Sequence, residues 1–175
     1  MGYYINTPDT FFAIPMNNLP RFFHLVDNLM SDKNVEENGQ GGSYSPPNGE
    51  KTASWYSWVC TDAVRRAVMD RDIVAVFREW GYELVEAYAA EGIQYYRLDI
   101  RDGEAKIGDE EKFFAAIAPV VESGCYIHVV GESGDEWRWI WENGKFYEMG
   151  VLRKELVFDE PNEIVFEDAN AKETF

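Results

Sequence analysis

The sequence predicts an α+β fold in which helices pack on one face of an antiparallel or mixed sheet. Two stretches with helical spacing of apolar residues each lie between two strand candidates, and several strand candidates are joined by hairpin turn signals. The helical stretches echo each other, as RFFHLV at 21–26 and KFFAAI at 112–117. Paired strand–helix–strand units among hairpins favour a ferredoxin-like variant with extra strands.

The first 60 residues predict a strand, a helix, a loop and a second strand. An apolar run at 10–14 ends at Pro15, and the helix at 19–30 presents an apolar face formed by Leu19, Phe22, Phe23, Val26, Leu29 and Met30. The segment 31–54 contains turn residues without periodicity, so we expect a long surface loop there, either a contact element or a mobile insertion. The aromatic segment 55–60 predicts the second strand.

The middle of the chain predicts two helices and a hairpin. A helix begins at Thr61-Asp62 and breaks near 70–72, and the next helix uses Ile73, Val76, Phe77 and Trp80 before it ends at Gly81. The segments 82–88 and 93–101 predict the two strands of a hairpin, because apolar and polar residues alternate in the second segment.

The last third predicts a helix and a three-stranded meander. Asp109 is the expected N-cap of the helix, and Pro119 should kink or end it. Strands are expected at 125–130, 136–142 and 145–149, with a tight turn at Asn143-Gly144 and a further strand at 151–158. We therefore expect one domain over 1–158, followed by an acidic tail at 159–175.

Charge is the least ordinary feature of the composition. The net charge is −16, and residues 81–175 hold 22 acids and 9 bases, whereas residues 1–80 hold 10 and 7. Such a surface repels nucleic acid and anionic lipid, so we expect neither direct nucleic-acid binding nor membrane binding. There is no signal-peptide pattern and no apolar run of membrane-spanning length, which predicts a cytoplasmic protein.

Three tryptophans alternate along one strand candidate, at Trp137, Trp139 and Trp141. Because they lie two residues apart, they project from the same face of the strand. They either pack in the core or form an exposed aromatic platform for a ligand or partner. The polar residues between them favour the core.

No motif predicts catalysis or metal binding. His24 and His128 are isolated, and Cys125 and His128 point to opposite faces of a strand, so they cannot form a dyad. Cys60 precedes a helix, where a thiol pKa can be lowered, although a small buried cysteine has the same pattern. We expect no metal and no cofactor, and the sequence favours a non-enzymatic protein without excluding an enzyme.

Both ends of the chain resemble a family of small acidic proteins encoded by bacteriophages and mobile elements. The resemblance rests on Tyr3-Tyr4-Ile5 and 11–15 at the N-terminus, and on Gly131-Glu132-Ser133-Gly134, Trp137-Arg138-Trp139 and Glu142-Asn143-Gly144-Lys145 at the C-terminus. It implies a bacterial or phage-infected cytoplasm and a role against a host system. It assigns no functional residues.

We therefore expect an acidic protein-binding domain that engages a basic, nucleic-acid-binding surface of a host protein. The acids expected to contact this partner are Glu83, Glu86, Asp99, Asp102, Asp109, Glu110 and Glu111. One alternative is a small-ligand or catalytic domain with an aromatic pocket. Another is a phage accessory or structural protein whose acidity only confers solubility. The sequence leaves the oligomeric state open.

Overall fold

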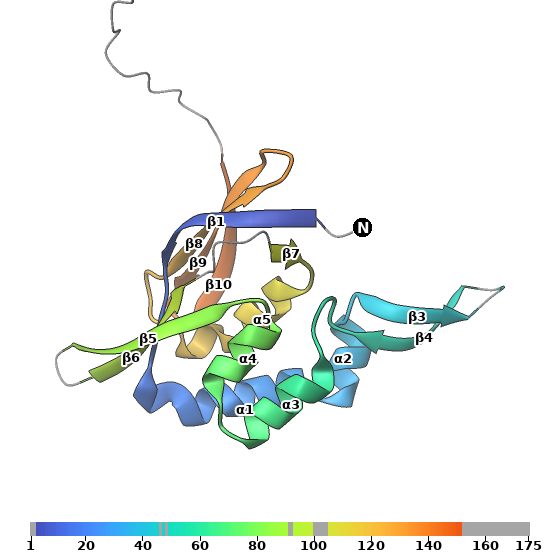
Figure 1. Cartoon of the computed structure of the whole chain (residues 1–175), viewed down its shortest axis with the longest axis horizontal. Helices are drawn as coiled ribbons and strands as arrows, with labels where there is room; N and C mark the ends of the chain where they lie inside the picture. The colour runs from blue at the N-terminus through green and yellow to red at the C-terminus, as the bar shows by residue number, and fades with distance from the viewer. Residues whose placement is uncertain (1–2, 46, 48, 91–92, 100–104, 152–175) are drawn as a thin grey trace, which may run out of the picture.

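A five-stranded antiparallel sheet forms the centre of the α+β fold. The computed structural model describes residues 3–45, 47, 49–90, 93–99 and 105–151, with the backbone alone for 85–90, 93–99 and 105. The sheet order is β10-β9-β8-β1-β7 (Figure 1). Its strands are β1 (Tyr3–Phe11), β7 (Ala105–Ile107), β8 (Tyr126–Gly131), β9 (Glu136–Glu142) and β10 (Lys145–Gly150).

The connection from β7 to β8 leads from one side of β1 to the other. Both β7 and β8 pair antiparallel with β1, so helix α5 (Glu110–Ile117) connects two strands that β1 separates. Pro119 lies in a 3-10 turn, η2 (Ala118–Val120), which confirms that the α-helix ends before it. Strand β7, helix α5 and strand β8 thus form a strand–helix–strand unit whose two strands are separated by β1. The expected ferredoxin-like variant is not confirmed.

A second sheet of three strands follows the order β2-β6-β5. It contains β2 (Ala13–Pro15), β5 (Glu83–Ala90) and β6 (Ile93–Asp99), and its last two strands form the expected hairpin. The chain passes from the first sheet to the second at Phe12, which is 1% exposed. One predicted strand, 10–14, is thus divided between two sheets.

Three helices complete the core, and each has a local reason for its boundaries. Helix α1 (Leu19–Leu29) follows the 3-10 turn η1 (Met16–Asn18), and Pro20 lies in its first turn. Helix α3 (Thr61–Met69) ends before Arg71, which has φ 57°. Helix α4 (Ile73–Glu79) is capped by the Asp72 side chain and terminates at Gly81, which has φ 86°.

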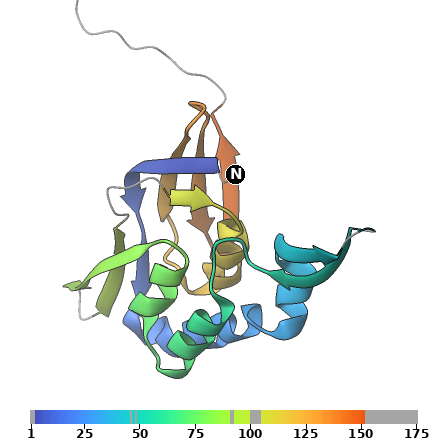
Figure 2. The ribbon, with the colours of Figure 1, turned by 45° about the vertical axis from the view of Figure 1, so that its right-hand side comes forward.

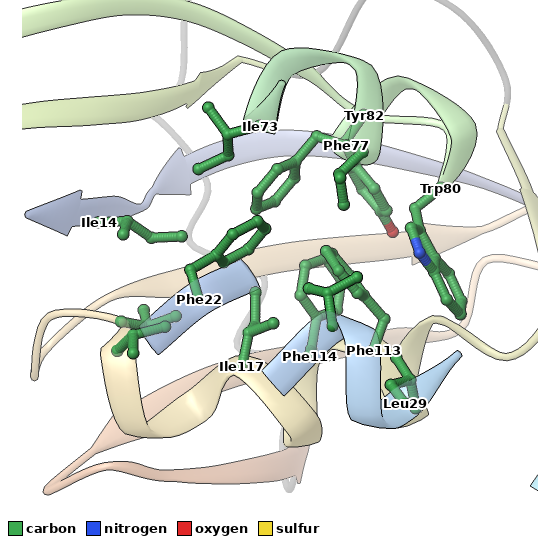
Figure 3. Packing of buried hydrophobic residues seen from close by; sticks show 14 of the residues in the cluster. Ile14, Phe22, Leu29, Ile73, Phe77, Trp80, Tyr82, Phe113, Phe114 and Ile117 are labelled. Carbon is green, nitrogen blue, oxygen red and sulfur yellow. The ribbon is translucent and has the colours of Figure 1, made fainter. Parts of the chain in front are cut away.

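Aromatic rings connect the helices to the sheet. Phe22 of α1 stacks on Phe77 of α4 with ring centroids 5.7 Å apart, and Trp80 stacks on Phe113 at 4.7 Å (Figure 3). Phe114 contacts the rings of Trp139 and Trp141 from β9. Burial of Phe22 and Phe23 in α1 and of Phe113 and Phe114 in α5 confirms that these two helices pack in the core through their phenylalanines.

Residues 31–54 are not the predicted loop. They form helix α2 (Asp32–Asn38) and an antiparallel pair of strands, β3 (Gly41–Ser45) and β4 (Glu50–Trp55). We call the two strands β3 and β4 the arm, and they project from the rest of the fold (Figures 1 and 2). Side chains on both faces of β4 are largely exposed, so no apolar alternation reveals the strand. The predicted strand at 55–60 is also wrong, because β4 ends at Trp55.

Candidate functional site

One face of the five-stranded sheet exposes an apolar row that runs across four strands. The pairing places Phe11 of β1 opposite Tyr126 of β8, Tyr126 opposite Ile140 of β9, and Ile140 opposite Tyr147 of β10. Phe11 is 47% exposed and Tyr147 is 44% exposed, whereas Tyr126 and Ile140 are half-buried. Together with Met149, which is 53% exposed, we call this surface the open face.

A register shift in β1 brings Phe11 to the open face. The pairing of β1 with β8 is irregular between Asn6 and Asp9. Before this bulge the odd-numbered Ile5 points into the core and is 3% exposed, whereas after it the odd-numbered Asp9 and Phe11 are exposed. A bulge of this kind reverses which face a side chain occupies.

Polar contacts fix the middle of the open face. The Tyr126 hydroxyl donates a 2.9 Å hydrogen bond to Asp9, and this bond raises the pKa of the phenol. The Arg138 guanidinium lies 4.5 Å from the centroid of the same ring. His128 Nε2 lies 3.4 Å from a Glu136 carboxylate oxygen. The Tyr126 ring is therefore held between Asp9 and Arg138.

Acidic side chains lie on the open face and around its edges, and we call them together the acidic border. Asp9 and Glu136 lie on it, Glu132 and Asp135 occupy the turn between β8 and β9, and Glu142 ends β9. Asp135 accepts a hydrogen bond from the Tyr3 hydroxyl at 3.0 Å, and Glu142 accepts one from Ser123 at 2.8 Å. Arg138 and Lys145 are the basic residues of the same strands, so the border carries an excess of negative charge.

Trp139 and Trp141 pack in the core, as the sequence favoured, so the three tryptophans do not form the alternative exposed platform. Trp139 and Trp141 are 0% and 1% exposed, and their indole nitrogens donate to Glu148 and to the Phe114 carbonyl. Trp137 is half-buried and packs against the core. The opposite face of the same strand, at Arg138 and Ile140, forms part of the open face.

The predicted acidic surface is only partly present. Asp109 and Glu110 are 1% and 5% exposed, so neither can meet a partner in this fold, because the segments around residues 40, 57 and 82 cover the start of α5. Glu111 is exposed, and Glu83 is half-buried. The side chains of Glu86 and Asp99 and the whole of Asp102 lie outside the described residues, as do the predicted strand at 151–158 beyond Val151 and the tail at 159–175.

Sulfur and imidazole groups do not come together. Cys125 is buried and accepts a hydrogen bond from the Ala13 amide at 3.2 Å, whereas His128 points to the open face. Cys60 is exposed at the start of α3, and His24 is exposed on α1. Within the described part of the chain, no three His, Cys, Asp or Glu side chains form a group that could hold a metal ion.

Comparisons with protein-family models, with curated proteins and with solved structures found no match. No helix of the described residues has the length and apolar character needed to cross a membrane. Sequence reasoning missed the open face because the run at 125–130 is apolar throughout and predicts burial on both sides. Only its pairing with Phe11 and Ile140 reveals an exposed row.

Proposed function

We propose that this chain is a non-enzymatic protein-binding domain that uses the open face to engage a basic protein surface. The observation that supports this most strongly is the apolar row from Phe11 to Tyr147, exposed at both ends and continued by Met149. Contiguous exposed apolar side chains mark interaction sites in soluble proteins, and aromatic residues are enriched at the centres of interfaces.

The acidic border defines the chemistry of the partner. A net charge of −16 repels acidic proteins and nucleic acid, whereas a lysine- and arginine-rich surface would be attracted from a distance. A partner with an apolar centre surrounded by basic residues would complement both parts of the open face. The resemblance to proteins of phages and mobile elements makes a bacterial nucleic-acid-binding protein the expected partner.

The fixed ring geometry supports binding by a preformed surface. Tyr126 is held by Asp9 on one side and by Arg138 on its ring face, so little side-chain freedom is lost on association. Met149 is unbranched and can adjust to the shape of a partner. We expect the aromatic residues to contribute most of the affinity and the acids to contribute most of the association rate.

Affinity capture from bacterial lysate with matched variants tests this function. Wild-type protein, the open-face variant Phe11→Ser/Tyr147→Ser and the control variant Tyr44→Ser/Met69→Ser are immobilised at equal density. The control removes two apolar side chains that are 59% and 75% exposed but lie on the arm and at the end of α3. Each sample is washed at about 50 mM and at about 500 mM salt, because screening weakens attraction between surface charges.

We expect wild type and control to retain the same basic protein at low salt and to release most of it at high salt. The open-face variant should retain at least about tenfold less, since loss of two interface anchors costs more than about 1.4 kcal/mol. Equal recovery by all three proteins would contradict the proposal. If neither wild type nor control retains a basic protein at low salt, the open face binds no such partner, and the acidity of the chain serves solubility only.

A further inference from the structure

One buried carboxylate holds both ends of the arm. Asp109 Oδ2 accepts a hydrogen bond from the Ser57 amide at 2.7 Å and another from the Gln40 amide at 3.1 Å. Gln40 directly precedes β3, and Ser57 follows the end of β4 by two residues. Because two amides far apart along the chain converge on a single oxygen atom, the position of the arm relative to the body depends on Asp109.

The next residue, Glu110, is a second buried carboxyl group. One Glu110 oxygen accepts a hydrogen bond from the Gly108 amide. In the described part of the chain, no lysine, arginine or histidine forms an ion pair with Asp109 or Glu110. Two neighbouring carboxylates that are both charged and both buried are costly, because each loses hydration and repels the other.

In the described part of the chain, buried polar atoms without a hydrogen-bond partner occur on Asp109 itself and on two residues that pack against the rings of α5. Asp109 Oδ1 is buried without a hydrogen-bond donor, and the Trp80 indole nitrogen and the Tyr82 hydroxyl are buried without partners. Trp80 stacks on Phe113, and Tyr82 packs edge-on against Phe114, so both lie over the first turns of α5 (Figure 3). The Tyr82 hydroxyl is close enough to Glu110 for that carboxylate to raise the pKa of the phenol, after the larger effect of burial.

The charged and titratable neighbours come from several elements. Tyr56 follows β4 and Tyr82 precedes β5, and burial raises the pKa of both phenols, so both are neutral near pH 7. Glu111 and Lys112 lie on α5, and Glu148 of β10 acts on Glu111. Lys112 is the cation of this set and offsets charge at Glu111. The pKa of Glu110 is raised to about 7, mainly by burial and to a smaller extent by the charges of Asp109 and Glu111, while the hydrogen bond from the Gly108 amide acts in the opposite direction.

We propose that a proton on the buried Glu110 carboxyl keeps the neighbouring Asp109 carboxylate hydrogen-bonded to the two amides at the base of the arm. With Glu110 neutral, no second charge lies next to the Asp109 carboxylate at the start of the helix, and the two amides at the base of the arm stabilise that carboxylate. When Glu110 loses its proton, a second negative charge appears beside Asp109, and no described lysine, arginine or histidine forms an ion pair with either carboxylate. Repulsion and hydration then favour opening of the first turn of α5 and release of Gln40 and Ser57.

The direction of the pH dependence follows from the raised pKa. A carboxyl group that binds its proton more tightly in the folded state stabilises that state below its ordinary pKa of 4.5. This contribution is lost as the pH rises towards about 7 and does not change further at higher pH. The arm should therefore be held more firmly at about pH 5 than at about pH 8.5.

Amide hydrogen exchange measured by NMR tests, at single residues, whether the Asp109 hydrogen bonds to Gln40 and Ser57 depend on pH. Protection of Ser57 and Gln40, corrected for intrinsic exchange rates, is compared between about pH 5 and about pH 8.5. We expect wild type to lose about tenfold in protection at both amides, while Ile127 and Val129 in β8 keep theirs. Glu110→Gln should retain high protection at both pH values, because glutamine preserves an oxygen acceptor for the Gly108 amide and cannot ionise. The neighbouring exposed control, Glu111→Gln, should still lose protection between the two pH values, with a midpoint slightly lower than that of wild type because the Glu111 charge contributes to the raised pKa of Glu110.

Three results would overturn the proposal. These are protection of Ser57 that does not vary with pH, a Glu110→Gln variant that varies as wild type does, and a loss shared equally by Ile127 and Val129. If Glu110→Gln does not fold, the carboxyl carbon of Glu110 in the wild-type protein provides a separate measurement. Its ¹³C shift should titrate near pH 7, and titration near pH 4.5 would exclude a bound proton at neutral pH.

Discussion

The indole nitrogen of Trp139 donates a 3.1 Å hydrogen bond to the Glu148 carboxylate. This contact joins the buried strand β9 to the edge strand β10 on the side that faces α5. Burial and the nearby Glu148 charge together raise the pKa of Glu111, so Glu148 both satisfies a buried donor and repels a neighbour. The balance between these effects can be measured.

Replacing Glu148 with alanine should destabilise the fold, whereas replacement with glutamine should be close to neutral. Alanine leaves the fully buried Trp139 donor without a partner, which costs about 1–3 kcal/mol in the free energy of unfolding. Glutamine keeps an oxygen acceptor and removes the charge beside Glu111. Urea denaturation at pH 7 of the two variants gives the comparison. Equal stability of the two variants would show that the hydrogen bond contributes nothing.

Phe114→Ala should be among the most damaging single substitutions in the core. The Phe114 ring is 0% exposed. It contacts aromatic rings from α5, from strands β9 and β10 and from the segments before β2 and β5, namely Phe12, Tyr82, Phe113, Trp139, Trp141 and Phe146. We expect a loss of about 3–5 kcal/mol from the removed contacts and the cavity. The matched control Phe11→Ala, on the open face, should change the free energy of unfolding by less than about 1 kcal/mol. Similar losses would mean that Phe11 is covered in solution.

The two cysteines should differ sharply in reactivity. Cys60 is exposed, whereas Cys125 is 0% exposed and burial raises the pKa of its thiol to about 11. At about pH 8 a thiol-specific chromogenic disulfide should therefore modify one thiol quickly in the folded protein and the second only in denaturant. Cys60→Ser should abolish the fast phase. Two fast thiols would contradict the burial of Cys125.

Gly39→Ala should displace the base of the arm. A Cβ atom at residue 39 would lie 2.5 Å from the Trp55 carbonyl oxygen and 2.7 Å from that of Val35, and neither backbone atom can move without shifting its strand or helix. We expect a lower melting temperature and reduced exchange protection of Gln40 and Ser57. Gly150→Ala is the matched control, because a Cβ there meets no atom within 4 Å. An unchanged arm in Gly39→Ala would show that this close approach is not maintained.

Local chemistry in the sequence determined much of the fold. Apolar spacing predicted α1 and α5, Gly81 predicted the end of α4, and Asn143-Gly144 predicted the turn between β9 and β10, where both residues have positive φ. These features depend on residues that are close along the chain, so a linear pattern is sufficient to find them. The α+β class and the core phenylalanines follow from the same patterns.

Only the tertiary structure decided which acids and which aromatic residues face solvent. Asp109 and Glu110 have the composition of an exposed helix start, but the segments that flank the arm and the segment around Tyr82 cover them. The open face requires a bulge in β1 and the pairing of residues 115 positions apart, Phe11 and Tyr126. The arm exposes most side chains on both faces and so leaves no periodic signal. Burial is a property of contacts between distant segments, and no local pattern records it.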